Sequence, residues 1–194
     1  MEKGGLADAL TAAGVKRDGA LMQADELRLG RRGQVRRVLA PRGVKVVQRV
    51  QIEYRWRHLL LGVDPRRGAL KWRWLERFRQ DHRTPVLASW GRDAVVGDGA
   101  GAPRGTPRRA RPTARVVRPP YRPERNPAER VFQEVRRRVA GRVAATRDDT
   151  QAEVEADLGD LAADPARVRR RCGWDGLRAA LAALPPGAAR GPAQ

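Results

Sequence analysis

The stretch YRPERNPAERVF, residues 121–132, is the most informative part of this sequence. The prolines before Asn126 prevent regular structure, because proline has no amide hydrogen and restricts the residue that precedes it. Asn126 is a favourable N-cap residue, and Pro127 occupies the first helical position, where proline is tolerated. The stretch therefore predicts a helix over residues 127–142 that follows a rigid loop and carries Glu129 in its first turn.

Apolar patterning predicts the other elements. Valine recurs every four residues from Val131 to Val143, which gives the predicted helix an apolar stripe. An antiparallel hairpin is expected around the Pro/Gly turn at 40–43, and one or two helices interrupted at Pro85 are expected within 74–90. Strands are expected near residues 20–30, 54–63, 69–74, 93–96 and 114–117, and later helices near residues 154–161 and 177–184.

This order of elements indicates an α/β fold with a mixed sheet. Early strands joined by tight turns favour antiparallel pairing, whereas later strands with longer connections permit parallel pairing. We expect a weakly ordered lead-in over 1–19, a main domain over 20–145, C-terminal helices over 146–184 and a disordered tail over 185–194.

The chain is strongly basic. Its 194 residues include 41 Lys and Arg against 22 Asp and Glu, a formal net charge of +19, and almost all of the excess is Arg. Arginine forks match phosphate oxygens, so the composition favours a nucleic-acid partner. The alternative is a GC-rich genome that encodes Arg and Ala wherever they are tolerated. The arginines expected to contact DNA are Arg104, Arg122, Arg125, Arg136 and Arg137.

Three carboxylates occupy positions suited to metal-ion chemistry. Asp25 is expected on the first strand, Asp98 at the end of a central strand, and Glu129 at the start of the helix. Clustered carboxylates are the ligands that Mg²⁺ prefers, and two such ions can catalyse phosphodiester cleavage. Each residue also has a structural interpretation: Asp25 as a strand-end acid, Asp98 as a turn residue within GDGAG, and Glu129 as the partner of Asn126 in a capping box.

Other chemistries have weaker support. His58 and His82 are the only histidines, which argues against a zinc cluster, and the glycine loop at 97–101 lacks the Lys-Ser/Thr end of a P-loop. Cys172 is the single cysteine, so no disulfide can form within the chain and a reducing cytoplasm is the simplest expectation. No stretch approaches the roughly 18 apolar residues of a membrane span, and no signal peptide is expected.

Four segments in order carry a family resemblance: ADELR (24–28), APRGVKV (40–46), VVGDGAGAPR (95–104) and PPYRPERNPAERVFQEVRRRV (119–139). Together they resemble bacterial insertion-sequence transposases of the mariner superfamily, which are DDE enzymes with a ribonuclease H-like fold. The resemblance covers about residues 20–180. Of the four, the Asn-Pro-x-Glu helix start after Pro-Pro-Tyr is the most specific.

The resemblance implies a function and a site. Asp25, Asp98 and Glu129 would be catalytic residues that hold two Mg²⁺ ions, or Mn²⁺ as a substitute, and Asn126 and Pro127 would orient Glu129. The implied reaction is cleavage of DNA at transposon ends and strand transfer into target DNA. The expected partners are DNA, a second copy of the chain on DNA, and a separate helix-turn-helix polypeptide; the expected location is the cytoplasm, at the nucleoid when bound to DNA.

The sequence also departs from the family pattern. Gly97 replaces the usual apolar or aromatic residue before the second aspartate, and Pro103 stands where the family commonly has histidine. Arg122 replaces the serine of Tyr-Ser-Pro. Residues 1–19 are also too short for a helix-turn-helix region, so the chain resembles the catalytic half alone. It would then be the second of two overlapping reading frames, a truncated copy or a degenerate remnant. The alternatives are therefore a catalytically inactive, basic DNA-binding remnant of a transposase and a folding-defective product.

Overall fold

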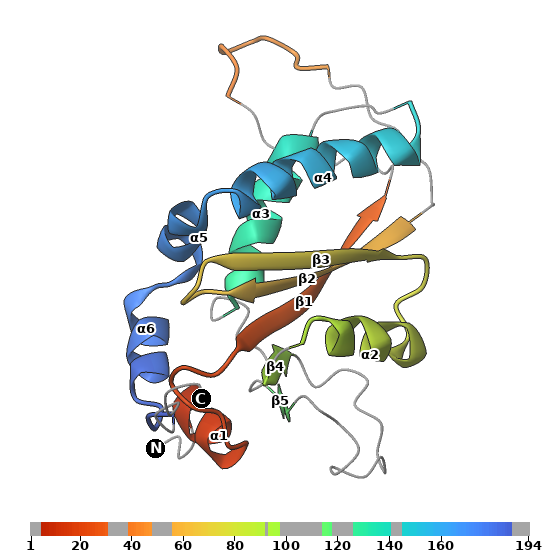
Figure 1. The fold of residues 1–194 in the computed structure, drawn as a ribbon. Coiled ribbons are helices and arrows are strands. Elements are labelled where there is room, and N and C mark those ends of the chain that lie inside the picture. Colours follow the sequence, from red (N-terminus) through yellow and green to blue (C-terminus); the bar gives the residue numbers. More distant parts are fainter. Residues whose placement is uncertain are drawn as a thin grey trace.

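The computed structural model describes residues 5–30, 39–47, 56–91, 93–97, 114–117, 126–140 and 145–187. Figure 1 shows a central sheet with helices on both faces. The strands are β1 (Leu21–Gly30), β2 (Trp56–Asp64), β3 (Ala69–Leu75), β4 (Ala94–Gly97) and β5 (Ala114–Val117). The helices are α1 (Leu6–Ala12), α2 (Gln80–Ser89), α3 (Pro127–Val139), α4 (Arg147–Ala162), α5 (Pro165–Cys172) and α6 (Asp175–Ala182).

The sheet is mixed, in the order β3-β2-β1-β4-β5. Strands β1, β2 and β3 pair antiparallel, with Asp25 opposite Leu61 in the β1–β2 register. Strands β1, β4 and β5 pair in parallel, with Gln23 beside Val96. The predicted mixed sheet, with its early antiparallel and later parallel strands, is confirmed.

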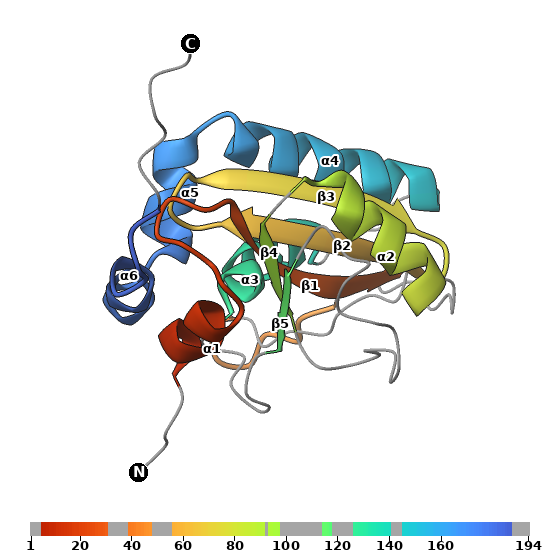
Figure 2. The same ribbon diagram turned by 60° about the horizontal axis from the view of Figure 1, so that its bottom comes forward.

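Side-chain alternation along β1 separates the two faces of the sheet. Leu27 and Leu29 pack with α3, α4 and α5, whereas Met22 and Ala24 pack with α2. Figure 2 shows α2 and α4 on opposite sides of the strands. Odd-numbered residues of β1 therefore face α3, and even-numbered residues face α2.

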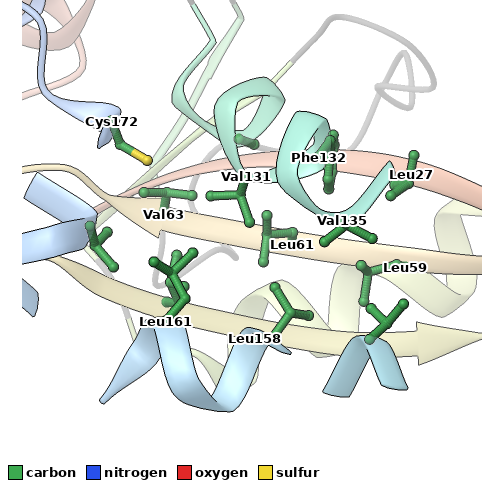
Figure 3. Close-up of a cluster of buried hydrophobic side chains, with 14 of the residues drawn as sticks. Leu27, Leu59, Leu61, Val63, Val131, Phe132, Val135, Leu158, Leu161 and Cys172 are labelled. Carbon is green, nitrogen blue, oxygen red and sulfur yellow. The ribbon is translucent and has the colours of Figure 1, made fainter. Parts of the chain in front are cut away.

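The largest hydrophobic cluster joins α3 and α4 to β2. Phe132 of α3 is fully buried, and Leu59 and Leu61 are fully buried beneath it. Figure 3 shows α3 and α4 side chains gathered around β2. A buried phenylalanine of this kind contributes about 3–5 kcal/mol to stability, so this cluster holds α3 firmly against the sheet.

Helix α3 begins where the sequence predicts. The side chain of Asn126 accepts a hydrogen bond from the amide of Ala128 at 3.1 Å, and Pro127 is the first helical residue. The helix ends at Val139, three residues before the predicted end. Arg136, Arg137 and Arg138 lie in its last turn, where cations offset the negative end of the helix dipole.

Several elements differ from the sequence-based expectation. Helix α1 lies within the lead-in, and its Leu10 is fully buried in a cluster with α6. Helix α2 continues through Pro85, because the carbonyl that loses its partner belongs to the exposed Asp81 and can bind water. The described part of the expected hairpin, residues 39–47, has a turn at Arg42-Gly43 and no strand.

Candidate active site at the start of helix α3

Asp25 lies in the middle of β1, on the sheet face that α3 covers. Its neighbours on that face are Gln23 and Leu27, and all three follow the odd-numbered alternation of the strand. The Asp25 carboxylate accepts a hydrogen bond from the backbone amide of Glu26 at 2.8 Å. The strand therefore fixes this carboxylate on a rigid support that is only partly buried.

Asn126 links Asp25 to the start of α3. Its side chain is almost fully buried, its amide nitrogen donates to the second carboxylate oxygen of Asp25, and its amide oxygen caps the helix at Ala128. One side chain thus satisfies a helix-end amide and a carboxylate 101 residues away in sequence. Together, these bonds fix the N-terminus of α3 over Asp25.

Glu129 lies in the first turn of α3, and about a quarter of its side chain is exposed. Its Oε2 atom forms an ion pair with Nη1 of Arg136 at 3.1 Å, seven residues further along the same helix. The helix is capped by the bond from the Ala128 amide to the side-chain oxygen of Asn126. A capping box forms at α4, between Thr146 and Asp149, but not at α3. The Glu129 carboxylate is therefore directed along the helix toward Arg136.

Strand β4 ends beside Ala24, one residue before Asp25 in β1. A Cβ atom built on Gly97 would lie 3.6 Å from the carbonyl oxygen of Ala24, the residue before Asp25. Gly97 is the last described residue of this strand, and the third expected carboxylate, Asp98, lies outside the described residues. The same holds for Pro103 and for three of the expected DNA-contacting arginines, namely Arg104, Arg122 and Arg125.

The two described arginines of that set occupy different environments. Arg136 is partly buried, pairs with Glu129, and lies 5.9 Å from the ring centre of Phe132. Arg137, the next residue of the last helical turn, is exposed. Arg136 thus pairs with a candidate catalytic carboxylate, while the side chain of Arg137 faces solvent.

Carboxylate oxygens at this site suit a hard divalent cation. Asp25 and Glu129 provide carboxylate oxygens, and the Asn126 amide oxygen is already used by the helix cap. Within the described part of the chain, no group of three or more His, Cys, Asp or Glu side chains could hold a metal ion. The donor chemistry of Asp25 and Glu129 fits Mg²⁺ or Mn²⁺.

Two further polar residues of the β1–β2 region escaped the sequence analysis. Gln23 is fully buried on the Asp25 face, and neither its amide oxygen nor its nitrogen has a hydrogen-bond partner. Glu26 forms a short contact with Nδ1 of His58, whose ring stacks on Phe78 at 5.9 Å. Glu26 faces α2, so the acidic pair Asp25–Glu26 is divided between the two faces of the sheet.

Comparison with solved structures identifies similar folds. A Mos1 transposase paired-end complex with the left transposon end matches with a TM-score of 0.61 and 13% identity, over 91% of this chain and 57% of that chain. A pre-cleavage Mos1 transpososome matches with a TM-score of 0.60 and 12% identity, over 84% and 54%. A Mos1 mariner paired-end complex with Mn matches with a TM-score of 0.59 and 14% identity, over 84% and 54%.

These similarities concern part of each solved chain, because this chain spans little more than half of their length. No protein-family description matches the sequence, and no curated protein matches it. In the described residues, no helix is long and apolar enough to cross a membrane. The fold is a ribonuclease H-like α/β fold, a mixed sheet with flanking helices, similar to that of the mariner transposase Mos1.

Proposed function

We propose that this chain is the catalytic domain of a DDE transposase of the insertion-sequence type. The observation that carries the proposal is the bond from Asn126 to Asp25, since it joins the first carboxylate to the helix that bears Glu129. The Mos1 structures supply independent support, because their fold resembles this one and one of them is a paired-end complex with the left transposon end.

Asp98 completes the proposed triad. The parallel pairing of β1 and β4 begins with Leu21 beside Ala94 and reaches Gln23 beside Val96. In each of these pairs the β4 residue lies 73 positions after its β1 partner. Asp98 follows Asp25 by the same 73 positions. A strand that keeps this register for two more residues would therefore set Asp98 directly beside Asp25.

In this proposal Asp25, Asp98 and Glu129 hold two Mg²⁺ ions, for which Mn²⁺ can substitute. The ions, when bound, would activate an oxygen nucleophile and stabilise the leaving oxygen of a phosphodiester. Asn126 and Pro127 orient the site: Asn126 holds Asp25, and Pro127 starts the helix that presents Glu129. Similar Mos1 complexes contain Mn and Mg.

The proposed reaction is cleavage at transposon ends followed by strand transfer into target DNA. The proposed partners are DNA, a second copy of this chain on DNA, and a helix-turn-helix polypeptide that recognises the ends. The expected location is the cytoplasm, with the nucleoid as the place of action. The competing function is a catalytically inactive, basic DNA-binding remnant, favoured by the ion pair that engages Glu129.

Calorimetric titration with Mn²⁺ tests the proposal. Asp98→Ala should lose saturable binding, whereas Asp81→Ala, which removes an exposed carboxylate of α2, should bind as the original chain does. Both variants should keep their circular dichroism spectra. DNA nicking that requires Mn²⁺ and disappears in Asp98→Ala would support the transposase. A folded chain that binds DNA but neither binds nor uses Mn²⁺ would refute it and favour the inactive remnant.

A further inference from the structure

A basic groove lies away from the carboxylate site. A groove of about 600 Å³ is lined by the β2–β3 turn, helix α5, helix α6 and the segment before β1. Figure 1 shows α5 and α6 at one end of the sheet, beside that turn. None of Asp25, Asn126 or Glu129 lines the groove, whose five charged lining residues are all arginines: Arg17, Arg66, Arg169, Arg170 and Arg178.

Arg66 forms a fixed wall of this groove. Burial lowers the pKa of its guanidinium, and its two terminal nitrogens donate to the backbone carbonyls of Arg17 and Gly19. The fully buried Asp64 accepts the backbone amide of Arg66 at 3.0 Å, which fixes the β2–β3 turn. The groove therefore has a preformed wall, which reduces the ordering that a ligand would have to impose.

The arginines of α5 divide into two pairs with different partners. Arg167 and Arg171 form ion pairs with Glu134 of α3 at 2.8 and 2.6 Å, so their charge is offset within the fold. Arg169 and Arg170 are exposed and line the groove instead. One bond, from Arg169 to the carbonyl of Arg67 at 3.2 Å, leaves most of the Arg169 donors available, since a guanidinium carries five N–H groups.

Acids close to the groove include Asp64, Asp18 and Asp93, which act on the charge of Arg66 in its wall, and Asp175, which lies beside Arg178. Arg178 lies 3.8 Å from Asp175, but Asp175 is fully exposed, and an exposed pair of this kind contributes little. Leu177 and Leu181 supply apolar surface between the arginines. A ligand that suits this lining carries several phosphates at regular spacing and has less polar groups between them, as the sugar–phosphate backbone of nucleic acid does.

We propose that this groove binds the phosphate backbone of DNA through Arg169, Arg170 and Arg178, at a surface separate from the carboxylate site. Its guanidiniums match phosphate oxygens as paired donors. The contact is independent of sequence and sensitive to salt, because it displaces counterions from the backbone. It does not depend on metal binding by Asp25, Asp98 or Glu129.

Binding of a fluorescent duplex, measured by anisotropy in EDTA, tests this surface. Arg170→Gln/Arg178→Gln removes two groove charges, and Arg73→Gln/Arg77→Gln removes two exposed charges around the end of β3. The groove variant should raise Kd about tenfold and reduce the salt slope by about 2, as expected for two lost phosphate contacts. The control variant should change Kd by less than about twofold. Equal weakening in both variants, or none in the groove variant, would overturn the proposal.

Photo-crosslinking tests the same surface with all the groove arginines in place, so it remains informative if the arginine variant fails to fold. Cys172 is buried and its thiol pKa is raised to about 12, so a thiol-directed crosslinker should label an introduced cysteine selectively. Ala182→Cys places the crosslinker at the groove, and Ser89→Cys places it at the exposed end of α2. We expect crosslinks to DNA from position 182 and not from position 89.

Competition with polyglutamate separates nucleic acid from an acidic protein partner. Unlabelled duplex should abolish the crosslink from position 182, while polyglutamate at equal charge concentration should not. Equal competition by polyglutamate would assign the groove to acidic peptides and overturn the proposal, as would a DNA crosslink no stronger at position 182 than at position 89. Anisotropy and crosslinking are both measured in EDTA, which removes divalent metal ions. Failure of the groove to bind DNA can therefore be distinguished from failure of the carboxylate site to bind Mn²⁺.

Discussion

Replacement of Asn126 is the sharpest perturbation of the candidate active site. The side chain is 3% exposed, and it makes two separable bonds, one to the amide of Ala128 and one to the carboxylate of Asp25. Asn126→Ala removes both bonds. Asn126→Ser keeps a hydroxyl that can cap the helix but is too short to hold Asp25, so it removes only the link between α3 and β1.

The two bonds predict different losses of stability. Loss of an N-cap costs about 1 kcal/mol, and loss of a hydrogen bond to a carboxylate costs about 1.5–3 kcal/mol. Because Asp25 is partly exposed, water can replace part of the second bond, and we expect a value near the lower limit. Asn126→Ser should therefore lower the free energy of unfolding by about 1.5 kcal/mol and Asn126→Ala by about 2.5 kcal/mol.

Urea unfolding followed by circular dichroism measures these losses, and a double-mutant cycle with Asp25→Ala isolates the link. For a chain of this size, the alanine variant should also lower Tm by about 5–10 °C. A coupling energy near 1–1.5 kcal/mol between positions 25 and 126 is expected. A coupling energy indistinguishable from zero would refute the reasoning that Asn126 holds Asp25 at the start of α3.

Three further predictions concern other parts of the fold. Gly62→Ala should lower the free energy of unfolding by about 1–3 kcal/mol in urea titrations, since its Cβ would lie 2.5 Å from Trp90; an unchanged midpoint would contradict this packing. The pKa of Cys172 rises from 9.0 to about 12 on folding, so its contribution to stability should be complete below pH 9 and lost as the pH approaches 12. Titrations at several pH values should therefore show a steeper alkaline decline in the original chain than in Cys172→Ala, and parallel declines would exclude this role. Arg136→Gln should free Glu129 and tighten Mn²⁺ binding up to about fivefold in calorimetry, and weaker binding would show that Arg136 supports the site.

The sequence correctly predicted the elements that are determined by residues within or next to them. Asn126 and Pro127 define the start of α3 through their own chemistry, and residues 114–117 form β5 as predicted. The mixed sheet followed from the lengths of the connections. These signals need no knowledge of distant residues, because caps, prolines and short β-branched stretches act within a few positions.

Elements that depend on packing were missed. The α1 sequence LADALTA has weak local signals, and it is held by burial of Leu10 against α6. Pro85 suggested an interruption, yet α2 continues because that part of the helix is exposed and water can replace the missing bond. The groove arginines could not be distinguished from the other arginines of α5 without knowing that Glu134 of α3 pairs with Arg167 and Arg171.

In the candidate site, too, the sequence suggested the residues, while their arrangement depends on contacts between distant parts of the chain. Predicted positions and the family resemblance suggested Asp25, Asp98 and Glu129, but a sequence separation of 73 residues does not determine a distance. The parallel register of β1 and β4 gives that separation a geometric meaning, because residues 73 positions apart are neighbours across these two strands. The bond from Asn126 to Asp25 then adds α3 to the same place. A register shift of one residue between β1 and β4 would exchange the two faces of β4, so the proposed triad depends on this pairing more than on any single carboxylate.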